Sequence, residues 1–259
     1  MTAQNPLRLC FWSGPRNVST ALMYSFAQRS DTRAIDEPLY AHYLRVSGAE
    51  HPGREVVLAA MENDGERVVR EVMLGPCDRP VLFMKQMAHH LIGLDWSFLG
   101  QTKNVLLLRD PQQVLKSLVK QLPHPQLRDT GLAQQVALLE RFGESGIPVI
   151  DSREILLNPR DILTQLCAQL GLNFEAEMLH WNAGPKPEDG VWADIWYANV
   201  HRSTGFEPYS ETDEPFPDHL RPLLDECQPL YEKLKSRALR TTAALEAHVA
   251  ANRVTGEPA

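Results

Sequence analysis

The chain has 259 residues, of which 43% are hydrophobic and 23% are charged, and its formal net charge is −7. These totals are ordinary for a globular protein, and we expect residues 1–259 to form a single domain. The negative charge disfavours binding along a nucleic-acid backbone, which needs a basic stripe. No apolar run approaches the ~20 residues that span a bilayer, and the first residues do not resemble a secretion signal, so no membrane partner is expected.

The four cysteines are far apart along the chain and fit no metal-ligand spacing. We therefore expect reduced thiols, a cytoplasmic protein and no bound metal. An anionic ligand would still require a local concentration of arginine, lysine and backbone N–H groups, and this requirement can be examined along the sequence.

The chain is organised around residues 7–26, which read LRLCFWSGPRNVSTALMYSF. The apolar start predicts a buried strand, and a turn and a helical pattern follow it. A helix N-terminus presents free backbone N–H groups and a partial positive charge to an anion. The predicted phosphate-binding loop consists of Gly14, Pro15, Arg16, Asn17, Val18, Ser19 and Thr20.

Further short strands are predicted at residues 32–36, 80–85, 104–108 and 147–151. The segments 80–85 and 104–108 are apolar runs suited to strands covered on both faces. Helical patterns separate these runs, and one that begins at Pro159 ends at Gly171, a residue type that often follows a helix C-terminus. Alternating buried strands and helices predict a three-layer α/β fold with a central parallel sheet of about five strands and helices on both faces.

In such folds ligands bind beyond the carboxyl ends of the strands. The residues that this rule gathers along one rim are Arg16, Glu37, Lys85, His89, His90, Arg109 and Ser152. Residues 181–215 are rich in proline, glycine and aromatic side chains and are interpreted as a lid or substrate segment over this rim. A last amphipathic helix is predicted from about 217 to 250, broken at Pro222 and Pro229, with a frayed tail at 251–259.

The first loop resembles the 5′-phosphosulfate loop of sulfotransferases that use 3′-phosphoadenosine 5′-phosphosulfate (PAPS). That loop reads PRSGTTLM in the protein-tyrosine branch, and here it reads PRNVSTALM, with Val18 in the place of the usual glycine. Arg109 and Ser117 have the spacing of the family's RNPKDVAVS, whose arginine and serine hold the 3′-phosphate. The segment SREILLNP is similar to the family's YEDLKKNP, with Ser152 where a tyrosine often lies against the adenine.

The resemblance implies a P-loop-like sulfotransferase of bacterial type that moves the sulfuryl group of PAPS to a hydroxyl or amine of a small-molecule acceptor. The other product would be 3′,5′-ADP, and no metal is required. Arg202, with Gly205, is compared with the family's late Arg-Lys-Gly cofactor segment. The sequence gives no information on the acceptor's identity or on the oligomeric state.

Several residues are candidates for the catalytic base. Glu37 follows the second strand, where the protein-tyrosine and glycosaminoglycan enzymes have a glutamate. His89 and His90 follow the third strand, displaced from the histidine of the cytosolic enzymes, and Lys85 could contact the transferring group. Structural alternatives remain open: an ion pair of Glu37 with Arg16 or Arg33, an ion pair of Arg109 with Asp36 or Glu154, and histidines on a helix surface.

Two other functions also remain open. In an ATP-dependent P-loop kinase-like phosphotransferase, Asp110 would hold Mg²⁺, but the sequence GxxxxGK[ST] that such an enzyme needs is absent. A non-catalytic nucleotide-binding module is the third hypothesis, and Val18 and the missing Lys-x-His pattern would be its signs.

Overall fold

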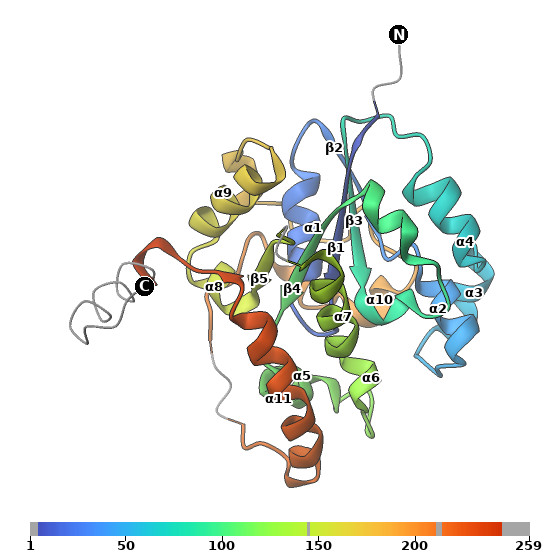
Figure 1. Cartoon of the computed structure of the whole chain (residues 1–259), viewed down its shortest axis with the longest axis vertical. Coiled ribbons are helices and arrows are strands. Elements are labelled where there is room, and N and C mark those ends of the chain that lie inside the picture. Colours follow the sequence, from blue (N-terminus) through green and yellow to red (C-terminus); the bar gives the residue numbers. More distant parts are fainter. Residues whose placement is uncertain (1–4, 144–145, 211–213, 245–259) are drawn as a thin grey trace.

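The structure is a computed structural model, and it describes residues 5–143, 146–210 and 214–244. Its sheet consists of β1 (Leu7–Ser13), β2 (Thr32–Asp36), β3 (Val81–Met87), β4 (Lys103–Leu108), β5 (Val149–Asp151) and β6 (Ala238–Leu239). The strand order is β2-β3-β1-β4-β5-β6 and every pair is parallel (Figure 1). The predicted α/β fold is confirmed, with a sixth strand too short to leave a periodic pattern.

The helices lie between and after the strands. The α-helices are α1 (Ser19–Ala27), α2 (Tyr40–Ser47), α3 (Arg54–Ala60), α4 (Gly65–Val68), α5 (Pro111–Leu118), α6 (Leu127–Thr130), α7 (Leu132–Phe142), α8 (Ser152–Leu157), α9 (Pro159–Leu170), α10 (Ala193–Trp196) and α11 (Arg221–Lys235). The described residues also form a short π-helix, η1 (Val69–Met73), and the short 3₁₀-helices η2 (Ala88–Leu91), η3 (Trp96–Gln101), η5 (Ala176–Leu179), η6 (Val200–Arg202) and η7 (Asp218–Leu220).

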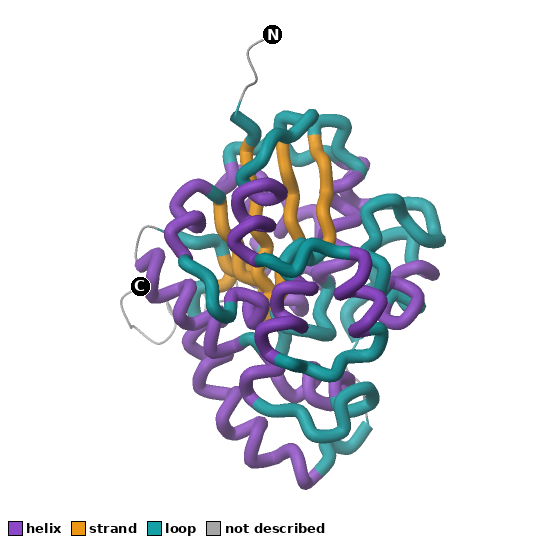
Figure 2. Tube along the Cα trace, turned by 90° about the vertical axis from the view of Figure 1, so that its right-hand side faces the viewer, coloured by secondary structure: helices purple, strands orange, loops and turns teal. Residues whose placement is uncertain are grey.

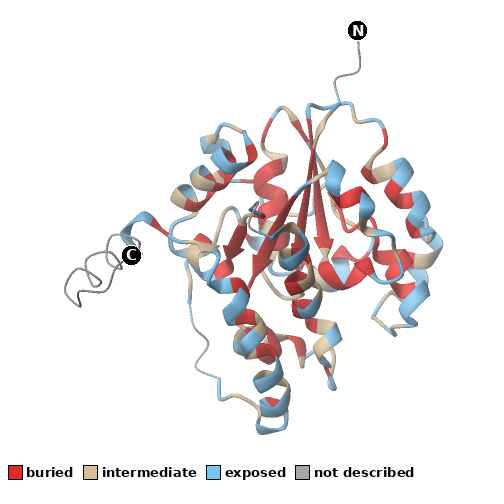
Figure 3. Ribbon diagram, viewed as in Figure 1, coloured by how far each residue is buried: buried red, intermediate tan, exposed pale blue. Residues whose placement is uncertain are grey.

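Helices cover both faces of the sheet because successive strand residues point to opposite sides. Leu9 and Phe11 of β1 share a core with α1 and α9. Cys10 and Trp12 of the same strand share the other core with α7 and α11. Buried residues accordingly run along the strands and the inner sides of these helices (Figure 3).

A third apolar cluster joins two distant parts of the chain. Tyr40, Tyr43 and Leu44 of α2 pack with Trp192 and Tyr197, which flank α10. Loops and short helices gather beyond one end of the strands, as Figure 2 shows. This packing brings the aromatic segment after residue 190 next to the strand ends, where the sequence predicts a ligand.

The last predicted helix differs from the observed one. The helix α11 is continuous from Arg221 to Lys235, with Pro222 in its first turn and Pro229 inside it, so it is not broken at either proline. Proline is tolerated in a first helical turn because the N–H group there has no partner within the helix. The chain then enters β6, and residues 245–259, including the predicted tail 251–259, lie outside the described residues.

Gly14 supplies a test of the packing between the first loop and α6. A Cβ atom at this position would lie 2.3 Å from the backbone carbonyl oxygen of Thr130. A backbone atom cannot move aside as a flexible side chain can, so Gly14→Ala should lower the free energy of unfolding by about 1–3 kcal/mol in urea denaturation. The control is Gly100→Ala, since a Cβ atom there meets nothing within 4 Å. Equal losses in the two variants would contradict this account.

Candidate active site

A cavity of about 370 Å³ lies where the loops after β1, β2, β3 and β4 meet. The predicted site residues that line it are Pro15, Arg16, Asn17, Val18, Ser19, Thr20, Glu37, Lys85, His89, His90 and Arg109. The segment interpreted as a lid contributes Trp192, Trp196, Tyr197, Asn199, Val200, Ser203, Gly205, Phe206 and Glu207. Residues more than a hundred positions apart therefore share one cavity.

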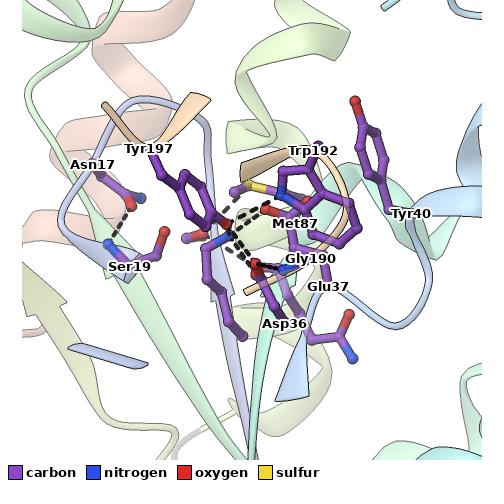
Figure 4. Close-up of polar contacts among 12 residues, drawn as sticks. Asn17, Ser19, Asp36, Glu37, Tyr40, Met87, Gly190, Trp192 and Tyr197 are labelled. Carbon is purple, nitrogen blue, oxygen red and sulfur yellow. Dashed lines mark hydrogen bonds and ion pairs between the residues drawn. The ribbon is translucent and has the colours of Figure 1, made fainter. Parts of the chain in front are cut away.

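Within the first loop, the Asn17 side chain makes two hydrogen bonds to the backbone. Asn17 donates from Nδ2 to the carbonyl of Gly14 (2.8 Å) and accepts from the backbone N–H of Ser19 (2.9 Å; Figure 4). Val18 precedes α1 with φ −88°, so its backbone does not require the glycine of the family. The residue of this loop that has a positive φ, 58°, is Arg16 and not Val18. Such strain in a residue other than glycine is frequent at functional sites.

Arg16 and Arg109 come together at one end of the cavity. The Nε atom of Arg16 donates to Oγ of Ser117 (2.9 Å), and Arg109 donates to the carbonyl oxygen of Arg16 (2.5 Å). No carboxylate of the described residues is within ion-pairing distance of either guanidinium, so Arg109 does not pair with Asp36 or Glu154. Burial lowers the pKa of both arginines, and repulsion from Arg16 adds to the effect on Arg109. A bound anion would offset both the desolvation of the two guanidinium groups and the repulsion between them.

Lys85, in contrast, is fully paired. Its ammonium group donates to Asp36 Oδ1 (2.9 Å) and to the carboxylate of Glu37. The structural alternative of an ion pair between Glu37 and Arg16 or Arg33 is therefore wrong, and Lys85 is the partner. Because one ammonium serves two carboxylates, the cluster keeps an excess negative charge.

The pKa values of Glu37 and Lys85 are both shifted in this cluster. Burial raises the pKa of Glu37, the ion pair with Lys85 opposes this, and the charge of Asp36 reinforces it; the net direction is upward. Burial alone would lower the pKa of Lys85, but Asp36 and Glu37 raise it well above its ordinary value. Glu37 also has a positive φ of 37°.

Asp36 anchors the late aromatic segment to the sheet. Its Oδ2 accepts from the hydroxyl of Tyr197 (2.7 Å) and from the backbone N–H of Gly190 (3.1 Å; Figure 4). The Tyr197 hydroxyl accepts in turn from Lys85 (2.8 Å) and from the indole of Trp192 (3.2 Å). Asp36 was not among the predicted site residues, although its place beside Glu37 at the end of β2 was visible in the sequence.

His89 and His90 are buried in η2, so the alternative of a helix surface is wrong for both. The ring of His90 stacks on those of Tyr40 and Tyr43, with centroids 5.1 and 4.7 Å apart. The Nδ1 atoms of His89 and His90 have no hydrogen-bond partner among the described residues. Burial lowers the pKa of His89 to about 3 and that of His90 well below its ordinary value, so both imidazoles are neutral at pH 7.

Five predicted or considered residues lie outside the cavity lining, and one of them is Ser117, which accepts from Arg16 (2.9 Å). Ser152 is buried and donates to the carbonyl oxygen of Leu108 (2.6 Å). Arg202 is exposed and donates to Asn199 (2.6 Å), and Gly14 lies beside Thr130 in a smaller pocket. Asp110, the candidate Mg²⁺ ligand of the kinase hypothesis, accepts from the backbone N–H of Gln112 (2.8 Å) and caps α5.

Other lining residues were missed by the sequence analysis. They include Tyr40, Tyr43, His51, Leu118, Asp129 and Leu156. These residues come from helices and from loops after them, where apolar and polar residues alternate without a recognisable motif. Only the packing of α2, α6 and α8 around the strand ends brings them to the cavity.

Residues 7–238 match the model of a family described as the sulfotransferase domain. The chain belongs to the sulfotransferase domain family. The Arabidopsis thaliana proteins named branched-chain-amino-acid aminotransferase-like protein 1 and 2 are each 40% identical to it, over 237 and 227 residues. These matches cover 90% and 86% of this sulfotransferase-family chain, but 42% and 40% of the plant proteins. The chain thus spans about two fifths of the length of these curated relatives.

Solved sulfotransferase structures share the fold. The sulfotransferase domain of a Synechococcus olefin synthase aligns with a TM-score of 0.51 and 16% identity over 87% of this chain and 96% of that domain. The sulfotransferase domain from the curacin biosynthetic pathway aligns with a TM-score of 0.51 and 15% identity over 89% of this chain and 98% of that domain. A sulfotransferase from Alicyclobacillus acidocaldarius aligns with a TM-score of 0.53 and 15% identity over 92% of this chain and 98% of that chain. The P-loop-like sulfotransferase fold that the motifs implied is confirmed.

None of the helices in the described ranges is long and apolar enough to cross a membrane. Within the same ranges, no three His, Cys, Asp or Glu side chains are grouped so that they could hold a metal ion.

The buried neutral state of His89 makes stability depend on pH. The unfolded chain takes up a proton near the ordinary pKa of 6.5, whereas folded His89 does so only at about 3, so stability is lost as the pH falls through this window. His89→Gln should reduce the stability lost between pH 7 and pH 4.5 by about 2 kcal/mol in urea denaturation. The exposed His124→Gln is the control. If both variants lose as much as the wild type, His89 is not buried in its neutral form.

Proposed function

We propose that this sulfotransferase-family chain moves the sulfuryl group of PAPS to a hydroxyl or amine of a small-molecule acceptor. We place this activity in the cytoplasm, where the four free thiols would stay reduced. The observation that carries the proposal is that the guanidinium groups of Arg16 and Arg109 share one cavity beside Ser117 and have no carboxylate partner among the described residues. Two partly desolvated cations in one cavity favour a ligand with several negative charges.

The residues present fit the two phosphate-bearing ends of PAPS. Arg109, Ser117 and the side chain of Arg16 form one anion-binding group, which we assign to the 3′-phosphate. The first turn of α1, with the Ser19 and Thr20 hydroxyls and free N–H groups, forms a second, which we assign to the 5′-phosphosulfate. Since Ser152 lies away from the cavity, Leu156 and Phe206 are the apolar side chains we assign to the adenine.

PAPS supplies an activated sulfuryl group, and the chain must then stabilise the leaving phosphate and remove the acceptor's proton. The α1 N-terminus suits the first task because its donors are already in place. Glu37 suits the second, since its raised pKa is closer to neutrality than that of an ordinary carboxylate. Lys85 fixes the Glu37 carboxylate from within the protein, so we assign this lysine to positioning of the base.

The alternatives have less support. The carboxylate that an ATP-dependent phosphotransferase would need, Asp110, caps α5 and does not line the cavity. The plant relatives are named aminotransferase-like, but this chain covers only about two fifths of their length, so the name can refer to a part that this chain does not match. An aminotransferase lysine forms a Schiff base in its uncharged state, and the raised pKa of Lys85 opposes that state. A non-catalytic module is distinguished by the absence of turnover in the experiments below.

Removal of one guanidinium tests the cofactor assignment. Arg109→Ala should weaken the binding of 3′,5′-ADP by roughly 10- to 100-fold in calorimetry, as for a lost charge-assisted hydrogen bond. The control is Arg202→Ala, because this exposed arginine lies outside the cavity lining. Wild-type protein that bound ATP with Mg²⁺ more tightly than 3′,5′-ADP would refute the proposed donor.

Replacement of the proposed base separates catalysis from binding. Glu37→Gln should leave 3′,5′-ADP affinity within twofold of wild type and lower kcat at least ~100-fold, the usual contribution of a general base. In the wild type, kcat/KM should fall as the pH drops below a pKa above that of an ordinary glutamate. If His90→Gln abolished transfer while Glu37→Gln did not, the histidine would be the base.

A further inference from the structure

The charges around the cavity are unevenly divided. Among its described lining residues the only lysines and arginines are Arg16, Lys85 and Arg109. The two arginines form the anion-binding group proposed above, and Lys85 is neutralised by Asp36 and Glu37. The part of the cavity beyond Glu37, here called the acceptor end, therefore has no unpaired cation for an acidic acceptor.

Aromatic rings form the wall of the acceptor end. Tyr40 stacks on His90 at 5.1 Å and meets Trp192 edge-on at 5.0 Å. Tyr43 stacks on His90 at 4.7 Å and lies 5.7 Å from the ring of His51. Burial lowers the pKa of His51 as it does for His89 and His90, so the imidazoles here add no positive charge at pH 7.

Two carboxylates, Glu37 and Asp129, line the same cavity as these rings. Burial raises the pKa of Tyr40 and the charge of Glu37 adds to the rise; burial likewise raises the pKa of Tyr43 and Asp129 adds to it. The Asp129 side chain is 16% exposed, and Arg128, its cationic neighbour, is 3.8 Å away and 76% exposed. A distant and exposed partner offsets little of a mostly buried charge. Asp129 Oδ2 accepts from the backbone N–H of Gln126 (2.8 Å), but among the described residues the carboxylate has no closer cationic partner than Arg128.

We propose that the acceptor is an organic cation, a hydroxyl compound with a protonated amine, which binds at the acceptor end. The inference rests on the proposed function and names its acceptor class. The hydroxyl faces Glu37, and the ammonium lies by Tyr43, His51 and Asp129. Aromatic faces and carboxylates attract an ammonium group, and the same groups repel an anion.

Three phenols that differ in charge alone at one end test this assignment. Tyramine carries a positive tail, 4-ethylphenol a neutral one and 4-hydroxyphenylacetate a negative one. Calorimetry on protein saturated with 3′,5′-ADP should show roughly tenfold tighter binding of tyramine than of 4-ethylphenol, as for a desolvated cation–π and carboxylate contact. The acid should bind more weakly than both. Equal affinities, tighter binding of the acid, or no binding of any of the three would overturn the proposal.

A pair of carboxylate variants locates the ammonium. Asp129→Asn keeps the side-chain oxygen that accepts from the backbone N–H of Gln126 (2.8 Å), so α6 should fold as before. It should bring the tyramine affinity down to that of 4-ethylphenol and leave the latter unchanged. Glu50→Gln, at a rim position where the side chain is 87% exposed, is the matched control and should change neither affinity more than twofold. A tyramine preference that survives Asp129→Asn would place the ammonium elsewhere and refute this site.

The failure of this inference can be told from that of the proposed function. If 3′,5′-ADP does not bind, the proposed PAPS dependence fails, and the acceptor class that rests on it is overturned with it. If it binds and the tyramine preference is absent, the acceptor class alone is wrong.

Discussion

The structure depends on a buried lysine that two carboxylates share. The parallel register of β2 and β3 sets Asp36 opposite Lys85, and the ammonium then reaches Glu37 as well. A buried charge must be paired, because its desolvation cost is otherwise several kcal/mol. Tyr197 completes the group from 112 positions along the chain, so the same cluster fixes Glu37 and holds the late aromatic segment over the cavity. The wall of the cavity and the proposed base are therefore not independent features.

The arginines at the other end show the opposite arrangement. Arg16 and Arg109 are partly desolvated, adjacent and without a described carboxylate partner, whereas Lys85 has two. The fold satisfies one cation internally and leaves two without a carboxylate partner among the described residues. This contrast distinguishes the structural ion pair from the proposed anion-binding group more clearly than residue identity does, since both kinds of cation lie at strand ends. Under the proposed function, the donor end and the acceptor end of the cavity therefore differ in electrostatic character.

Much of the framework could be predicted from the sequence. Apolar runs predicted β1, β3 and β4, because a strand buried on both faces has no polar alternation. The two other expected strands, β2 and β5, are also present. The rule that ligands lie at carboxyl ends then gathered six of the seven rim residues around the actual cavity, and only Ser152 lies elsewhere. β6 was missed because a two-residue strand has no periodicity, and the last helix was predicted too long because its amphipathic pattern continues past Lys235.

The sequence by itself determined the order of strands and helices, the loop after β1 and the spacing of Arg109 and Ser117, since each depends on residues close together along the chain. Tertiary structure alone decided that Arg16 lies against Ser117, that Lys85 pairs with Asp36 and Glu37, and that Asp129 lines the same cavity as Tyr43. The physical reason is that the partners of a buried charge are chosen by how the layers pack. Local pattern fixes which face of an element is apolar, but not which distant side chain will lie across from it.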